Sequence, residues 1–179
     1  MNLSKRTIRI VTLLAAGAFL AFALLFPFRF ALTVTDARGT LLYAKSARPG
    51  DTFELRFIHS VHRTPVEEAY TIDQSGGLVL ERVVYETYGV GNPSQAEPGQ
   101  RFRIEDGKMI IDSFDRRFDD IRLRIGQRVA EHELIVGGRA VPLREIGAPG
   151  ERVTIKAKKL SVWSLLTRQR GGHHDEYES

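Results

Sequence analysis

One segment of the chain gathers side chains that could do chemistry. Between two runs of alternating apolar residues it reads His59-Ser60-Val61-His62-Arg63-Thr64-Pro65-Val66-Glu67-Glu68-Ala69-Tyr70. Imidazoles and carboxylates can exchange protons or ligate a metal, and a guanidinium with hydroxyls can receive an anionic solute or a carboxylate of a partner protein. The candidate binding residues are His59, Ser60, His62, Arg63, Glu67, Glu68 and, further along the chain, Tyr85.

The flanking strands determine where these side chains point. Counting in twos along residues 53–57, whose odd positions are apolar, places His59 on the inward face of its strand. The same count along residues 70–72 places Glu68 on the inward face of the next strand. We therefore predict that His59 and Glu68 are inward-facing neighbours in a β-hairpin.

Two hairpin registers with a four-residue loop keep apolar residues opposite apolar residues. The first pairs Phe57 with Tyr70, and it sets His59 directly opposite Glu68. The second pairs Leu55 with Tyr70. In that register Glu68 lies diagonally from His59. Either arrangement brings the two side chains within reach, and burying them is costly unless they find partners.

The sequence leaves several uses of this pair open. The two side chains could be structural and lock the hairpin, or they could bind a solute. A metal site of His59, His62 and Glu68 would need the loop to bend, because His62 points away from His59 in a straight strand, and no metal is predicted. Catalysis by Ser60 meets the same difficulty, and a Gly-x-Ser-x-Gly motif is absent. We therefore expect no enzyme activity and no cofactor.

Glycine and proline mark the turns near this segment. The strand that contains Tyr85 leads into Gly89-Val90-Gly91, where neither a third glycine nor a helical pattern follows. A dinucleotide-binding motif is therefore excluded. Gly89, Gly91 and Pro65 are assigned as structural turn residues, since glycine permits positive φ and proline fixes its own φ.

The two-residue period of strands continues through most of the chain. Strands are predicted at residues 32–35, 40–44, 52–59, 66–72, 78–88, 108–114, 121–125, 133–136, 140–144 and 152–157. Turn signals such as Gly76-Gly77 and Asp106-Gly107 separate them. Many short strands with one apolar face indicate an all-β fold, an antiparallel β-sandwich-like domain over residues 32–166.

The first thirty residues indicate one N-terminal transmembrane helix before this domain. Residues 1–9 carry three Lys or Arg side chains, and residues 10–28 form an uncharged apolar run, about 28 Å long as a helix. The cations predict a cytoplasmic N-terminus, a single pass through the cytoplasmic (inner) membrane, and a domain that faces the periplasm or the outside. A cleaved signal peptide is the alternative, since Ala21-Phe22-Ala23 fits a cleavage site.

Composition restricts the classes of function. The 179 residues include no cysteine, which excludes thiolate catalysis and cysteine-bound metals. The net charge of +4 is spread along the chain without a basic block, so nucleic-acid binding is not predicted.

Residues 156–170 suit a last strand or short helix, or a membrane-surface contact through Trp163. Residues 171–179 are predicted to be a disordered polar tail.

The motifs His59-Ser60-Val61 and Pro65-Val66-Glu67-Glu68, followed by Tyr85 and Gly89-x-Gly91, resemble a family of small exported proteins of bacteria and archaea with no assigned function. Its members begin with an apolar segment and are often encoded beside membrane subunits of TAXI-type TRAP transporters, which move organic anions with an extracytoplasmic solute receptor. The resemblance implies a membrane-anchored accessory domain that contacts the membrane subunits or the solute receptor, and it transfers no catalytic residues. The alternatives are a solute- or metal-binding module on the His59–Glu68 hairpin and an exported hydrolase.

Overall fold

The computed structural model describes residues 5–26, 29–87, 96–161 and 163, with the backbone alone at residues 7, 8 and 115. The chain separates into two compact units, one of residues 1–29 and 159–179 and the other of residues 30–158. The tail predicted at residues 171–179 lies outside the described residues.

The described residues form one α-helix, eleven strands and one turn of 3₁₀-helix. These are α1 (Lys5–Leu25), β1 (Arg29–Asp36), β2 (Leu41–Ser46), β3 (Thr52–Ile58), β4 (Pro65–Ile72), β5 (Leu78–Tyr85), β6 (Arg101–Glu105), β7 (Lys108–Phe118), β8 (Ile121–Arg124), β9 (Glu133–Val136), β10 (Arg139–Pro142), η1 (Leu143–Glu145) and β11 (Arg152–Leu160).

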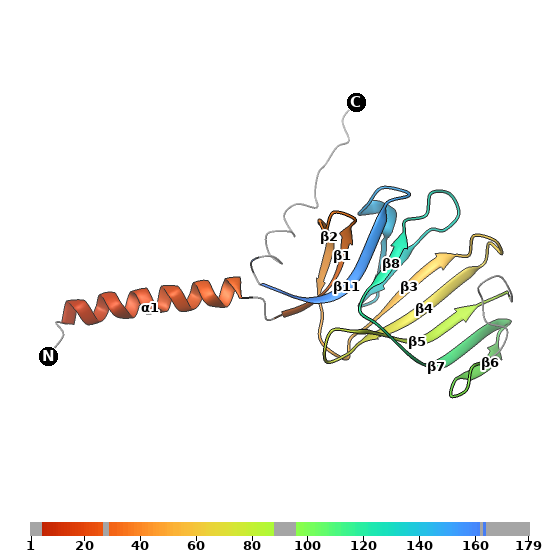
Figure 1. Ribbon diagram of the computed structural model, residues 1–179, viewed down its shortest axis with the longest axis horizontal. Coiled ribbons are helices and arrows are strands. Elements are labelled where there is room, and N and C mark those ends of the chain that lie inside the picture. The colour runs from red at the N-terminus through yellow and green to blue at the C-terminus, as the bar shows by residue number, and fades with distance from the viewer. Residues whose placement is uncertain (1–4, 27–28, 88–95, 162, 164–179) are drawn as a thin grey trace, which may run out of the picture. The chain divides into compact units, whose positions relative to one another are not determined.

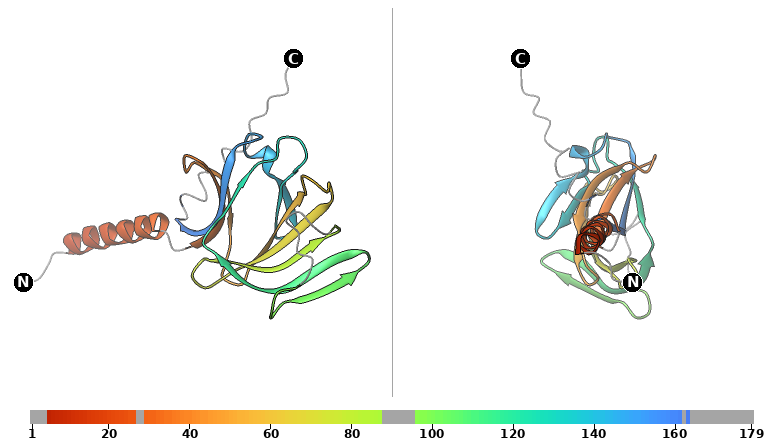
Figure 2. Two further views of the ribbon diagram at one scale, coloured as in Figure 1. Left: turned by 45° about the vertical axis from the view of Figure 1, so that its right-hand side comes forward. Right: turned by 90° about the vertical axis from the view of Figure 1, so that its left-hand side faces the viewer.

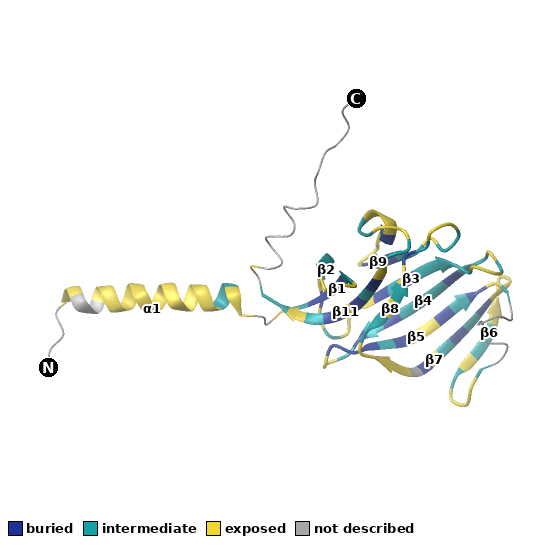
Figure 3. Cartoon of the chain, turned by 45° about the horizontal axis from the view of Figure 1, so that its top comes forward, coloured by how far each residue is buried: buried dark blue, intermediate teal, exposed yellow. Residues whose placement is uncertain are grey.

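Helix α1 has 21 residues and exposes most of its apolar side chains. Leu13 is 72% exposed and Phe19 is 73% exposed. The exposed apolar residues occur on all sides of the helix, because successive residues are about 100° apart. Figure 3 shows α1 coloured as exposed along almost its whole length. Among the residues that the structure describes, no helix meets the length and apolar content needed to cross a membrane.

The second unit contains two β-sheets that pack on each other (Figures 1 and 2). The smaller sheet has the strand order β2-β1-β11-β8, and the larger sheet has the order β10-β9-β3-β4-β5-β7-β6. The pairs β1–β2 and β8–β11 are antiparallel, as are the neighbours from β10 to β6 in the larger sheet. The all-β, antiparallel sandwich-like fold expected from the two-residue period is confirmed.

The core lies between the inward faces of the two sheets. Its largest fully buried side chains are Tyr85, Phe53, Leu32, Ile72, Leu78, Ile111, Ile125, Leu134, Leu143, Ile155, Val34 and Val153. Alternate residues of β3 and β11 are buried, as the period of two requires. The hydrophobic burial of such side chains is the main stabilising contribution to the sandwich.

The predicted strands correspond to strands of the structure, with one omission. Strand β6 was not expected, because three of its five residues are charged and only Phe102 and Ile104 are apolar. It is an edge strand that pairs with β7 alone, so it needs few buried side chains. The last strand, β11, extends to Leu160. The segment 156–170 therefore begins as a strand, which was one of the predicted alternatives.

Candidate functional site

The candidate segment is the hairpin of β3 and β4. Its loop has four residues, Ser60 to Arg63, and is closed by two backbone hydrogen bonds. The His59 N–H donates to the Thr64 carbonyl at 2.9 Å, and the Arg63 N–H donates to the His59 carbonyl at 2.8 Å. Arg63 has φ of 56°, a left-handed conformation that lets a short loop reverse the chain. The loop is therefore a defined turn built around His59.

His59 supports this turn with its side chain as well. Its Nδ1 atom accepts the backbone N–H groups of Val61 and His62, both at 3.3 Å. The rings of His59 and His62 lie 4.9 Å apart. Since Nδ1 accepts these bonds, the neutral imidazole carries its proton on Nε2. His59 therefore has a local structural role at the tip, whose most exposed large apolar residue is Val61, at 60%.

Both predicted registers of the hairpin are wrong. The structure pairs Phe53 with Tyr70 and Leu55 with Glu68. His59 lies four residues beyond Leu55, which corresponds to about 13 Å along the strand. Glu68 is therefore neither opposite nor diagonal to His59, and the predicted His59–Glu68 pair does not form.

Glu68 does face inward, as its position in the strand predicted. It lies in a row of directly paired residues that crosses the larger sheet. The row consists of Val141, Leu134, Leu55, Glu68, Val83, Ile111 and Phe102. Glu68 is the one charged residue in this row, and it is half-buried. A carboxylate in such surroundings needs a hydrogen-bonding partner.

Tyr70 is that partner. Its hydroxyl donates a hydrogen bond of 2.7 Å to Oε2 of Glu68. The Tyr70 ring stacks on Phe53, with centroids 5.2 Å apart and planes 10° apart, and it meets Phe118 edge-on at 6.3 Å. Burial raises the pKa of Glu68, and the Tyr70 hydrogen bond offsets part of this rise. Burial and the neighbouring carboxylate also raise the pKa of Tyr70, so the phenol stays protonated as a donor.

The other predicted site residues are dispersed. Glu67 lies on the outer face, where its Oε1 is 3.3 Å from Nε of Arg56. Tyr85 is fully buried opposite Val66. Ser60 is exposed in the loop, and Pro65 begins β4 opposite Ile58. Gly89 and Gly91 lie outside the described residues.

The hairpin therefore does not assemble the metal site that was considered. The rings of His59 and His62 are adjacent, but Glu68 pairs with Leu55, four residues before His59. In the part of the chain that the structure describes, no group of three or more His, Cys, Asp or Glu side chains is arranged to hold a metal ion.

The structure shows a second feature that sequence reasoning missed, a cleft beside His132. Its volume is about 180 Å³, and the polar side chains lining it include Gln127, Arg128, Glu131, His132 and Arg144. Nδ1 of His132 accepts the Gly126 N–H at 3.3 Å. Burial lowers the pKa of His132, which favours the neutral ring. In the neutral ring Nδ1 can accept the hydrogen bond from the loop while Nε2 donates a second hydrogen bond.

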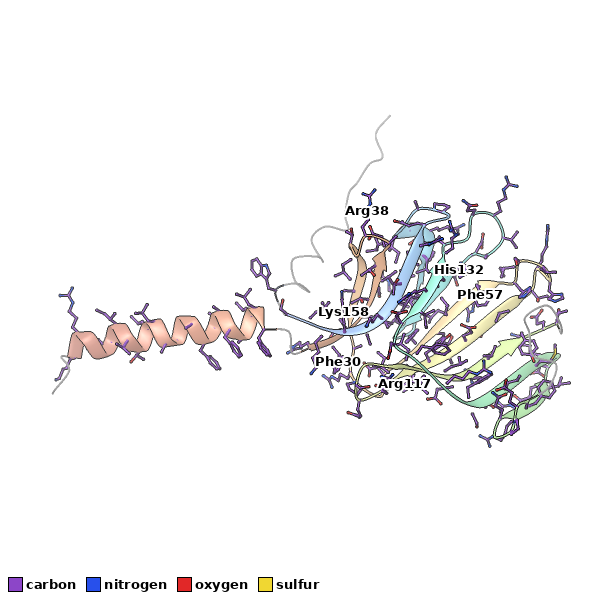
Figure 4. All side chains as sticks on the ribbon, viewed as in Figure 1. Phe30, Arg38, Phe57, Arg117, His132 and Lys158 are labelled. Carbon is purple, nitrogen blue, oxygen red and sulfur yellow. The ribbon has the colours of Figure 1, made fainter. Side chains whose placement is uncertain are left out.

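The loop of the cleft is tightly folded. A Cβ at Gly126 would overlap the backbone carbonyl of Ala130, so only glycine fits there. Figure 4 shows His132 beside Phe57, and their ring centroids are 5.5 Å apart. The sequence did contain a signal for this position. Counting back in twos from Val136 and Leu134 places His132 at an inward-facing position directly before β9.

The family comparison gives the class of protein. Residues 53–143 match the family described as "Domain of unknown function (DUF1850)", and the chain belongs to that family. The matched region contains the larger sheet from Phe53 onward, the hairpin, strand β8 and most of the residues that line the His132 cleft, whereas β1, β2 and β11 lie outside it. No curated protein and no solved structure matches the chain.

Proposed function

We propose that this protein is a non-enzymatic accessory domain that is attached to the cytoplasmic membrane and assists a TAXI-type TRAP transporter. The β domain works outside the cytoplasm and contacts the transporter's solute receptor or its membrane subunits. The resemblance of the His59–Glu68 segment to proteins encoded beside such transporters supports the choice of partner. The observation that carries the proposal is the exposed apolar surface of α1.

Helix α1 is unfavourable in water. Nine large apolar side chains between Ile10 and Phe26 are 49–73% exposed in the protein alone. A helix that is apolar on all sides belongs in a protein core or in lipid. Its first residues include Lys5, Arg6 and Arg9, and such cations stay on the cytoplasmic side. The proposal therefore attaches α1 to the bilayer with this end inside and the β domain outside.

The hairpin tip is the contact that the proposal assigns to the transporter. It presents Val61 beside His62 and Arg63 on a turn held by hydrogen bonds. An apolar side chain among polar donors on a rigid loop suits protein recognition, because little conformational entropy is lost on binding.

Transport and crosslinking test the proposal together. A strain that lacks this protein alone should lose uptake of the organic anion handled by the neighbouring transporter. Because the natural chain has no cysteine, Val61→Cys provides a single crosslinking site at the tip, and Lys108→Cys, at the exposed start of β7, is a matched control. Crosslinks to transporter components from position 61 but not 108 are expected. Unchanged uptake of every solute would overturn the proposal.

The His132 cleft favours a second candidate function, the binding of a small organic anion by this domain itself. Arg144 lies at the cleft, with Nη1 3.4 Å from the Glu131 carboxylate, and the ion pair is exposed enough to exchange partners. Calorimetric titration with organic acids should show binding that Arg144→Gln removes. If none of the organic acids produces heat of binding, this second candidate function is excluded.

A further inference from the structure

The two sheets differ in the charge of their outer faces. On the larger sheet, acidic and basic side chains alternate and pair. Arg56 lies 3.3 Å from Glu67 and 4.0 Å from Glu54, and Arg103 pairs with Asp112 and, at 2.7 Å, with Glu105. On this face the named cations therefore have carboxylates beside them.

The outer face of the smaller sheet is basic. The buried residues Val153, Ile155 and Ala157 of β11 point into the core, so the residues between them point outward. The outward cations on strands β8 and β11 are Arg122, Arg124, Arg152, Lys156 and Lys158. Asp120 flanks these cations and accepts hydrogen bonds of 2.9 and 3.1 Å from Arg122.

Two of these arginines face each other directly. Arg124 and Arg152 are partners in the β8–β11 register, where like charges destabilise a sheet. Arg124 donates one bond to the Gly150 carbonyl at 2.9 Å, which relieves only part of this repulsion. A shallow groove of about 490 Å³ runs over the pair. Its lining includes Arg122, Arg124, Arg152 and Thr154. The arrangement leaves guanidinium donors directed at solvent, where an anion would offset their repulsion.

We propose that this basic face docks on the phosphate headgroups of anionic phospholipids in the membrane to which α1 attaches the protein. The inference rests on the proposed attachment through α1. The occupant follows from charge complementarity and from the chain itself, since β1 begins at Arg29, four residues after α1 ends at Leu25. Each cation near an anionic bilayer surface increases the partitioning of a protein onto that surface about fivefold. The basic face therefore holds the β domain against the lipid.

The test uses the full chain reconstituted in vesicles. Thr154→Cys places a single thiol in the basic face, and Thr71→Cys places one on the outer face of the larger sheet as the matched control. Each is labelled from outside with a donor dye, and acceptors are carried on the lipid headgroups. The vesicles consist of phosphatidylcholine with or without phosphatidylglycerol.

Energy transfer from position 154 should rise when phosphatidylglycerol is present and fall again at high salt, and transfer from position 71 should not change. Replacing Arg122, Arg124 and Arg152 together by Glu should remove the rise. Replacing Arg82, Arg101 and Lys108 by Glu should preserve it.

Equal transfer from position 154 in both vesicle types would overturn the docking surface. Failure of the protein to float with phosphatidylcholine vesicles would instead refute attachment through α1. If flotation instead requires phosphatidylglycerol together with Arg122, Arg124 and Arg152, the docking of the basic face on anionic lipid would still be supported.

Discussion

Tyr70 donates a 2.7 Å hydrogen bond to Glu68, two residues earlier on the inward face of β4. The half-buried carboxylate has its partner within its own strand, and the Tyr70 ring is held by stacking on Phe53. The first prediction follows from this pair. Tyr70→Phe should lower the free energy of unfolding by about 1–3 kcal/mol at pH 7, because Glu68 loses its donor.

Urea unfolding measures that loss. Tyr43→Phe is the control, since Tyr43 is a half-buried tyrosine of the smaller sheet whose hydroxyl is not bonded to Glu68. Equal losses in the two variants would contradict the pairing, because they would reflect only the general effect of removing a hydroxyl.

The second prediction concerns the pH dependence that Glu68 produces. Burial raises the pKa of Glu68 above 4.5, so the folded state keeps this proton to higher pH than the unfolded chain does. The free energy of unfolding should therefore fall as pH rises from about 4.5 through the folded pKa. Glu68→Gln should remove this fall while keeping an acceptor for Tyr70. Parallel stability–pH curves for the natural protein and the variant would contradict the prediction.

Asp73 should show the opposite dependence. This carboxylate accepts the Ser75 N–H and hydroxyl at 2.7 Å and the Gly77 N–H at 2.8 Å, and it pairs with Arg117 at 2.6 Å. The side-chain hydrogen bonds from Ser75 and Arg117 lower its pKa below 3.8. Its contribution to stability is therefore present above about pH 3.8 and is lost as pH falls through the lower folded pKa.

Asp73→Asn should therefore be less stable than the natural protein at neutral pH, with a difference that shrinks in acid. Asp119→Asn is the matched control, because Asp119 pairs with the same Arg117 but is 79% exposed. Thermal unfolding at several pH values should show no comparable change for that variant. A pH-independent difference at Asp73 would indicate that its charge does not matter.

Gly126 should be intolerant of any side chain. In Gly126→Ala the new Cβ meets the Ala130 carbonyl, and the loop that carries His132 must move. A loss of about 1–3 kcal/mol or more is expected in chemical unfolding. Gly107→Ala is the control, since Gly107 has φ of 76° and open space around it, and its cost should be about 1 kcal/mol. Gly126→Ala should also abolish any ligand binding in the cleft.

Sequence reasoning located the inward faces but not the hairpin register. The two-residue period places His59 and Glu68 on inward faces whichever register forms, since shifts of two residues preserve which side chains point inward. The register that forms pairs Phe53 with Tyr70, whose rings stack, and it leaves a loop that ends at Arg63 in a left-handed conformation. Neither ring stacking nor a left-handed arginine is visible in a pattern of apolar and polar residues.

The same limit explains the His132 cleft. His132 occupies an inward position that the period could have located, yet the cleft also needs the loop from Gly126 to Ala130 to fold back tightly. That fold depends on a close approach between Gly126 and a backbone carbonyl, which no local periodicity encodes. The charge contrast between the sheets likewise depends on which strands become neighbours, as β8 and β11 do.

A double-mutant cycle tests the register directly. In the observed hairpin three residue pairs lie between His59 and Glu68, so the effects of His59→Ala and Glu68→Gln should add within about 0.5 kcal/mol. The cycle of Tyr70→Phe with Glu68→Gln should instead show a coupling of about 0.5–3 kcal/mol, because those side chains are hydrogen-bonded. Urea unfolding of the natural protein, the three single variants and the two double variants provides both values. A coupling at His59 as large as that at Tyr70 would mean that the imidazole and carboxylate meet, and that the hairpin pairs in one of the shifted registers.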